Sequence, residues 1–308
     1  MARTTWYIYT MELTTGENDK GRRLDRILRK ALPDHPLPLL HRLLRQGQVF
    51  VNGKKASAQH RVACGDTISI PLLEGKGKDE AKNALSALDL PPLNIIWQDK
   101  GLLAVNKPAG IAVHGPESLE TAVLSFLEGK LPPSLSFKSG PLHRLDKPSS
   151  GIVVFSASLE GAGLFSSLLR ERKVKKTYLA IVEGAVDSEE IWQEQLVRDK
   201  KMKKTFVSGK NTAAAGKPAV TKIRPLVKNS GHTLVEAEIA TGRTHQIRAQ
   251  AAFHGHPLAG DKKYGGHGKD GLFLHAWKLE FLEYKIEAPP PQAFREKTAE
   301  LFSEMYVF

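Results

Sequence analysis

Residues 141–158 read PLHRLDKPSSGIVVFSAS and join a candidate reactive loop to the strand expected to follow it. The run Gly151–Phe155 is short, apolar and uncharged, which is typical of a strand in the interior of a sheet. Ser158 is placed to cap a helix that we expect to reach about Arg172. Because scaffolds present reactive groups on loops beside regular elements, the tetrapeptide HRLD, residues 143–146, is a candidate functional segment.

A second segment dense in functional side chains is TGRTHQIR, residues 241–248. It follows an expected strand, Thr233–Ile239, and begins an expected helix, whose free backbone N–H groups would suit an anionic ligand. Taken singly, Arg243 and Arg248 are ordinary surface cations and His245 is an ordinary hydrogen-bonded histidine. The segment becomes a candidate functional site only in combination with HRLD.

The remaining pattern of elements predicts the fold class. Short strands and helices follow one another without regular β–α alternation, so an α+β fold is favoured over a doubly wound sheet. We expect a mixed, largely antiparallel sheet flanked by helices. The expected strands include Ile95–Trp97, Leu102–Val105, Tyr178–Val182 and Ala219–Val227, and Thr121–Leu127 is an expected helix.

Four motifs in this order carry a family resemblance: HRLDKPSSG, KKTYLAIVEG (175–184), TGRTHQIR and HPLAGDKKYG (256–265). Over about residues 93–290 the chain resembles the pseudouridine synthases of the RluA/RluC/RluD type. The resemblance implies an isomerase that detaches a uracil base from its ribose in RNA, turns it and rejoins it through carbon 5. Atoms and electrons are conserved in that reaction, so no cofactor is expected, and the chain contains no dinucleotide or phosphate-loop fingerprint.

The resemblance implies three catalytic residues. Asp146 matches the catalytic aspartate, which could attack the anomeric carbon, stabilise charge there or abstract a proton. Arg248 matches the arginine that pairs with this aspartate and orients it. Tyr178 matches the tyrosine that stacks on the target base.

The resemblance also implies a set of substrate-binding residues. Ile247 matches the apolar residue packed against the base, and Arg144 matches an arginine that fills the gap left by a flipped nucleotide. His143 belongs to the same set, and Arg243 and His245 either contact phosphate or brace their loop. Two positions depart from the pattern: Ser149 stands where threonine is common, and Gln250 stands where a histidine is often found.

The amino-terminal part is strongly basic. Residues 20–61 contain eleven Lys and Arg against two Asp, so +9 of the chain's net charge of +12 lies in 42 residues. The stretches RLDRILRKALP, LLHRLLRQGQVFVNGK and CGDTISI predict two helices and a small hairpin sheet, and resemble the alpha-L RNA-binding motif named after a small-subunit ribosomal protein. The expected RNA-binding residues are Arg22, Arg23, Arg26, Arg42, Arg45 and Lys54.

Composition limits the remaining possibilities. The chain has 308 residues, 41% hydrophobic and 25% charged, which fits about two globular domains. We expect an extension (1–19), the alpha-L domain (20–72), a linker (73–92) and a catalytic domain (93–308). The basic balance favours RNA as partner, ribosomal RNA first and transfer RNA second. We expect no membrane span, no metal site, a cytoplasmic location and a monomer.

Two other functions compete with this hypothesis. A non-catalytic RNA-binding ribosome-assembly factor would have the same basic domain, but a decayed catalytic set. A methyltransferase acting at carbon 5 of uracil generally needs a cysteine nucleophile. The single cysteine, Cys64, lies in the basic domain and away from the motifs, which excludes that reading.

Overall fold

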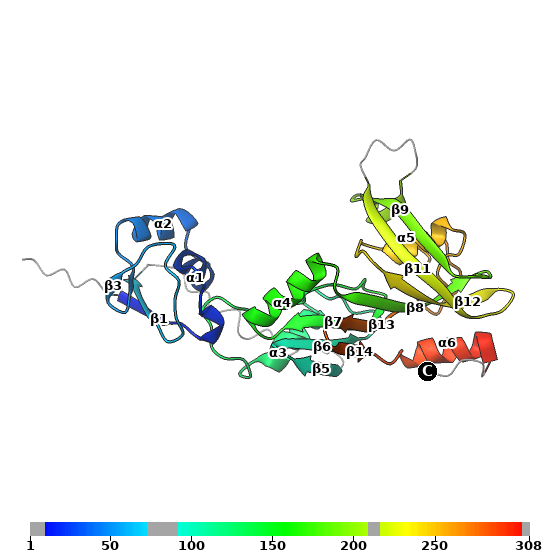
Figure 1. Cartoon of the computed structure of the whole chain (residues 1–308), viewed down its shortest axis with the longest axis horizontal. Helices are drawn as coiled ribbons and strands as arrows, with labels where there is room; N and C mark the ends of the chain where they lie inside the picture. Colours follow the sequence, from blue (N-terminus) through cyan, green and yellow to red (C-terminus); the bar gives the residue numbers. More distant parts are fainter. Residues whose placement is uncertain (1–9, 73–91, 209–215, 304–308) are drawn as a thin grey trace, which may run out of the picture.

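The computed structural model describes residues 10–72, 92–208 and 216–303. The linker expected at 73–92 lies almost entirely outside these residues. Within the described ranges, the structure has a small amino-terminal domain and a larger domain built on one long sheet (Figure 1). No helix in these ranges is long and apolar enough to span a membrane.

The amino-terminal domain packs two helices on a four-stranded sheet. Leu24, Ile27 and Leu28 are fully or almost fully buried, and their helical spacing gives α1 one apolar face. The sheet has the order β1-β4-β2-β3. The elements are β1 (Thr10–Thr14), η1 (Glu17–Asp19), α1 (Leu24–Ala31), α2 (Leu37–Arg45), β2 (Phe50–Val51), β3 (Lys54–Lys55) and β4 (Thr67–Pro71).

Two features of this domain differ from the sequence-based expectation. Strand β1 pairs with β4, so the domain's sheet includes residues that the sequence analysis placed in an extension. Helix α2 begins at Leu37, two residues before the stretch LLHRLLR that predicts it, because Pro36 is its N-cap residue and Pro38 lies in the first turn. Proline is tolerated there, since the first helical N–H groups have no intrahelical partner.

The larger domain is built on a sheet of ten strands in the described residues, in the order β10-β9-β11-β12-β8-β13-β7-β6-β5, with β14 paired to β13. All neighbours are antiparallel except β13 and β7. The strands are β5 (Ile95–Asp99), β6 (Leu102–Lys107), β7 (Ser150–Ser156), β8 (Lys175–Glu183), β9 (Glu190–Asp199), β10 (Lys204–Val207), β11 (Lys217–Lys228), β12 (His232–Ile239), β13 (Leu274–Phe281) and β14 (Tyr284–Glu287).

Helices cover both faces of this sheet. On one face, α3 and α5 pack against a core that includes Val105, Phe155 and Tyr178. On the other face, α4 and α6 pack in separate clusters, one with Ile152 and one with Leu179. The helices are α3 (Leu119–Leu127), α4 (Leu159–Arg170), α5 (Gln246–Phe253) and α6 (Gln292–Phe302). The expected α+β class with a mixed, largely antiparallel sheet is confirmed.

The alternation of β8 positions the functional face. Successive side chains of a strand point to opposite faces. Leu179 and Ile181 therefore join the cluster under α6, whereas Tyr178 and Ala180 point to the side of α5. Ser158 caps α4 by accepting a hydrogen bond from the Gly161 N–H at 2.9 Å, as the sequence predicts.

Candidate active site

One cavity of about 360 Å³ lies where the loop before β7, strand β8 and the start of α5 meet. Its lining combines acidic, basic and aromatic groups from segments that are far apart in the sequence. All eight catalytic and substrate-binding residues expected from the sequence line it: His143, Arg144, Asp146, Tyr178, Arg243, His245, Ile247 and Arg248.

A tight turn presents Asp146. The Ser149 N–H donates to the Asp146 carbonyl at 3.1 Å, and Asp is favoured at the first position of such a turn. The next element is β7, where Gly151 has φ +111° and lies against the backbone of β13. A Cβ at Gly151 would stand 2.3 Å from the Ala276 carbonyl oxygen, so only glycine lets the two strands approach. The side chain of Asp146 is 16% exposed toward the cavity.

Arg248 connects Asp146 to a second, deeper carboxylate. Its Nη1 donates to Asp146 Oδ2 at 3.1 Å, while Nε and Nη2 donate to the two oxygens of Asp261 at 2.7 Å each. The side chains of Arg248 and Asp261 are only 6% and 1% exposed. The bidentate pair fixes the plane of the guanidinium, and the remaining nitrogen is thereby aimed at Asp146.

His245 adds a neutral imidazole beside Asp146. Its Nε2 lies 3.7 Å from Asp146 Oδ2, and its Nδ1 lies 2.9 Å from the Tyr264 hydroxyl. Burial lowers the pKa of His245 to about 4, against the opposing charge of Asp146. The Tyr264 oxygen already accepts the Thr205 N–H at 2.8 Å, so its own proton is available to Nδ1. In the neutral tautomer that accepts this proton at Nδ1, Nε2 carries the ring proton and faces the Asp146 carboxylate.

The backbone of His245 supports a functional reading of this position. Its φ of 56° and ψ of 24° lie in the left-handed region. A residue other than glycine there costs roughly 1–2 kcal/mol. Such conformations gather at functional sites, where the surrounding structure holds them. Here the Gln246 side chain holds the loop, because its Oε1 accepts from the Arg243 N–H and the Thr241 hydroxyl.

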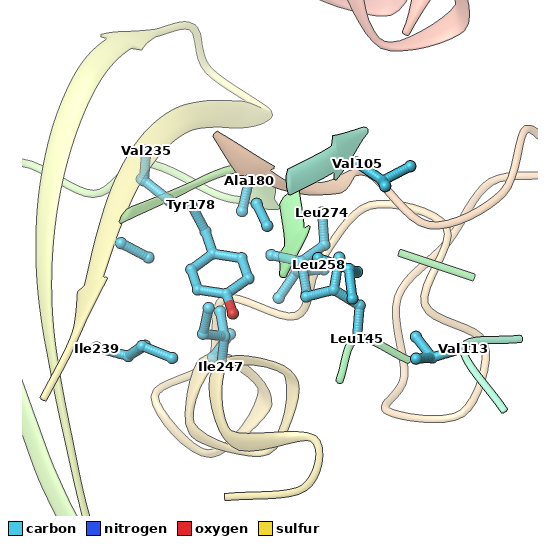
Figure 2. Packing of buried hydrophobic residues seen from close by; sticks show 14 of the residues in the cluster. Val105, Val113, Leu145, Tyr178, Ala180, Val235, Ile239, Ile247, Leu258 and Leu274 are labelled. Carbon is cyan, nitrogen blue, oxygen red and sulfur yellow. The ribbon is translucent and has the colours of Figure 1, made fainter. Parts of the chain in front are cut away.

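Tyr178 and Ile247 form the apolar wall of the cavity. The phenol of Tyr178 projects from β8 toward Ile247 on α5, with Ile239 and Leu145 nearby (Figure 2). Burial, and secondarily the charge of Asp146, raise the pKa of Tyr178 far above its usual value. The phenol is therefore neutral, and its flat ring can contact a base.

The other expected residues divide by exposure. Arg144 is exposed at the cavity rim. His143 is turned inward and accepts the Val154 N–H at 3.1 Å, and burial lowers its pKa to about 3. Arg243 donates from Nε to the Pro218 carbonyl at 3.0 Å. Gln250 faces β9 and β11, and its side-chain Nε2 donates to the Trp192 carbonyl and to Glu194 Oε2. It does not line the cavity.

Arg243 also borders a second hollow of about 470 Å³, which shares the lining residues Gly242, Arg243 and Thr244 with the first. Two further cations line it, Arg198 from β9 and Lys217 from β11, and both are exposed. A positively charged hollow therefore lies next to the active-site cavity.

Sequence reasoning missed three residues that support the site. Asp261 and Tyr264 lie in the quoted motif HPLAGDKKYG but received no role. Lys107 ends the apolar strand β6 and is fully buried, with Nζ donating to the carbonyls of Pro108, Ile111 and Lys147. Burial lowers the pKa of Lys107 to about 8, and the charge of Asp146 opposes this. A lysine closing a buried apolar strand was the available signal.

The described residues contain no cluster of histidine, cysteine or carboxylate side chains suited to a metal ion.

In the amino-terminal domain, four of the six expected RNA-binding residues are exposed: Arg26, Arg42, Arg45 and Lys54. Arg23 forms an ion pair with Asp25 at 2.6 Å, and Arg22 bonds Ser136 of the larger domain.

Comparisons with known proteins agree with this geometry. Residues 101–253 match the family described as RNA pseudouridylate synthase, and residues 22–68 match the S4 domain. The chain is 33% identical to ribosomal large subunit pseudouridine synthase C of Vibrio vulnificus, over 89% of each chain. It is 30% identical to the protein of that name from Escherichia coli, over 90% of this chain and 92% of the relative.

A solved structure supports the same conclusion. Human RNA Pseudouridylate Synthase Domain Containing 4 matches with a TM-score of 0.58 and 25% identity, covering 68% of this chain and 92% of its own. The chain belongs to the RNA pseudouridylate synthase family, a family of isomerases, and carries an amino-terminal S4 domain. The resemblance inferred from the motifs is thereby confirmed.

Proposed function

We propose that this protein converts specific uridines of large-subunit ribosomal RNA to pseudouridine, with Asp146 as the reacting group. The observation that carries the proposal is the cavity in which Asp146 meets Arg248 on one side and Tyr178 with Ile247 on the other. The choice of RNA follows the relatives, which are named for the large ribosomal subunit. Transfer RNA is the second candidate.

In this proposal the cavity receives a uridine that has left its stack. Tyr178 and Ile247 hold the base by its faces, and Arg144 at the rim takes the place of the flipped nucleotide. Flipping costs a few kcal/mol, part of which a planar guanidinium can recover by stacking. Asp146 then acts at the ribose or the base while Arg248 balances its charge.

The positive groove beside the cavity fits the RNA backbone. Arg198, Lys217 and Arg243 border a hollow next to the base-binding cavity, where the phosphates beside a flipped nucleotide would lie. We assign Arg243 to this backbone contact. His143 braces the loop before β7 from within, and His245 orients Asp146 through Nε2. In the amino-terminal domain, Arg22, Arg23, Arg26, Arg42, Arg45 and Lys54 remain our RNA-binding set, with the four exposed members as its main part.

The test is to incubate the purified protein with large-subunit ribosomal RNA transcribed without modification. Nucleoside mass spectrometry detects pseudouridine, and chemical mapping locates it. Pseudouridine at one or a few positions, absent with Asp146→Asn, is expected. Tight binding with no pseudouridine in this RNA or in transfer RNA would favour the non-catalytic assembly factor.

A monomer working in the cytoplasm completes the proposal. The cavity is lined by residues of a single chain, so a second copy is not required to build it. Light scattering coupled to size-exclusion chromatography, with and without RNA, measures the mass. A dimer mass in both conditions would contradict the monomer.

A further inference from the structure

The amino-terminal domain and the larger domain are joined by specific contacts. The segment Gly16–Arg22, between β1 and α1, lies against the loop Pro133–Ser136 of the larger domain. At its centre Asp19 is fully buried, although carboxylates are almost never buried without partners. This carboxylate belongs to neither the basic helices nor the active site, so its burial requires an explanation of its own.

Hydrogen bonds from the larger domain satisfy the Asp19 carboxylate. The Leu135 N–H donates at 2.9 Å, the Ser136 N–H at 3.1 Å and the Ser134 hydroxyl at 2.7 Å. The Ser136 hydroxyl contacts it as well, and the Gly16 N–H donates from its own segment at 2.9 Å. Burial alone would raise the pKa of Asp19, but these hydrogen bonds lower it below its usual value.

Three further contacts surround the carboxylate. Arg22 Nη1 donates to the Ser136 carbonyl at 3.0 Å and lies 2.9 Å from its hydroxyl. A Cβ at Gly16 would stand 1.7 Å from the Pro133 carbonyl oxygen, so the two backbones touch at a glycine. Leu135 packs against the core of the amino-terminal domain. The junction therefore combines charge, close backbone approach and apolar contact.

Helix α4 links this junction to the active site. The Asn18 side chain accepts the N–H of Leu159, the first residue of α4, at 2.8 Å. Near the other end of α4, Leu169 lines the active-site cavity. A helix of 12 residues is about 18 Å long. Figure 1 shows α4 between α1 of the amino-terminal domain and strands β8 and β11.

We infer that the junction of Asp19 with the loop 133–136 fixes the RNA-binding helices at a set distance from the cavity. It thereby selects which uridine, counted from the RNA element held by α1 and α2, reaches Asp146. Asp19 is in this view a positioning residue for site selection. The inference rests on the proposed function for its RNA part, whereas the rigid junction stands independently of the substrate.

The experiment compares Asp19→Ala with wild type in two assays. Small-angle X-ray scattering of the full chain measures the spread of distances between the domains. Pseudouridine mapping on ribosomal RNA measures the modified position. The control is Asp34→Ala, which removes an exposed carboxylate of the same domain. Asp19→Asn keeps one acceptor oxygen and should restore part of the wild-type behaviour.

We expect Asp19→Ala to broaden the distance distribution. Modification at the wild-type uridine should fall at least about tenfold, and neighbouring uridines should become modified. The single-turnover rate on a short uridine-containing stem-loop, which does not reach the amino-terminal domain, should stay within about twofold of wild type. Equal losses on both RNAs would show a general structural defect and overturn the inference.

Two other results would also overturn it. One is an unchanged scattering profile, because Asp19 would then not hold the domains. The other is a broadened profile with the same uridine modified at the same rate. Should Asp19→Ala fail to fold, Ser134→Ala and Ser136→Ala each remove a hydroxyl that contacts the Asp19 carboxylate and take its place in both assays. If the wild type makes no pseudouridine on any RNA, the proposed function fails, while scattering still judges the junction.

Discussion

The arginines of the amino-terminal helices and the arginine of the active site are used in opposite ways. On α1 and α2, Arg26, Arg42 and Arg45 are exposed to solvent. In the active site, Arg248 is 6% exposed and lies between two carboxylates, Asp146 and Asp261. The same side chain is therefore a hydrated charge in one domain and a fixed structural link in the other.

This difference has a physical consequence for what each residue can do. Exposed cations attract phosphate through a screened field, so each contributes a small, salt-dependent and nearly additive share of RNA affinity. A buried guanidinium shared by two carboxylates cannot be removed without leaving buried charge unpaired. Changes in the first region should be graded, and changes in the second should be close to all-or-none.

The largest loss of activity is expected at Asp146, which pairs with the buried Arg248 and faces the cavity. Asp146→Asn should lower the single-turnover rate of pseudouridine formation by at least about 10³-fold, the scale on which loss of a reacting group is felt. RNA affinity should stay within about twofold, because removing a negative charge does not weaken phosphate binding. The control Asp34→Asn should behave as wild type. More than a small fraction of wild-type turnover in Asp146→Asn would remove Asp146 from its role.

Arg243 and Arg248, both in residues 241–248, allow a half-buried and a buried arginine to be compared within one segment. Arg248→Ala should reduce activity by about 10²-fold or more and lower the free energy of unfolding by about 3–5 kcal/mol, since Asp261 is left buried without its partner. Arg243→Ala removes one hydrogen bond to Pro218 and one groove cation, and should cost less than about tenfold, mainly in affinity. Kinetics and urea unfolding of both variants measure this. Similar losses in the two variants would show that Arg248 is not the arginine that orients Asp146.

A pH dependence of stability follows from two histidines of the catalytic domain, the half-buried His143 and the buried His275. Burial lowers the folded-state pKa of His143 to about 3 and of His275 to about 4, below the ordinary value of 6.5. The unfolded chain therefore binds these protons first as pH falls. The contribution of the neutral histidines to the free energy of unfolding is complete above pH 6.5. It declines from there toward pH 3–4, by about 1.4 kcal/mol per pH unit for each histidine.

Thermal unfolding between pH 7.5 and pH 4.5 measures this decline. His275 accepts from the Ser150 hydroxyl and donates to the Ala288 carbonyl, so His275→Gln retains polar groups while removing the titration. This variant should unfold at a lower temperature at pH 7.5 and be less sensitive to acidification. A slope equal to wild type would show that His275 does not contribute to the pH dependence.

The smallest effect is expected for the exposed arginines of the amino-terminal domain, and it concerns RNA affinity. Replacing Arg42 and Arg45 together with alanine should weaken RNA binding at physiological salt by several-fold. The slope of log affinity against log salt should decrease by about 0.7–0.9 for each phosphate that is no longer neutralised. The rate at saturating RNA should not change. Arg295→Ala on α6, on the face of the sheet opposite α5, is the matched control. An unchanged salt slope in the double variant would place the RNA on another surface.

The sequence alone determined the features that depend on neighbouring residues. The apolar spacing of Leu24, Ile27 and Leu28 predicted α1, and Ser158 predicted the start of α4. The motifs predicted the family and the eight residues around the cavity, because each motif is contiguous and its composition is specific. Elements without a strong local signal were missed, namely β1, β9, β10, β13, β14 and α6.

The tertiary structure decided the contacts between residues far apart in the chain. Arg248 and Asp146 are 102 positions apart, and Asp19 and Ser136 are 117 apart. No periodicity or spacing encodes such pairs, since a carboxylate finds its partner only after the sheet has brought loops and helices together. The same holds for the support that Asp261 gives Arg248 and for the contact of His245 with the Tyr264 hydroxyl. The motifs and the family resemblance thus predicted the reacting groups. The fold supplied the partners that orient them, because an unpaired buried charge is costly.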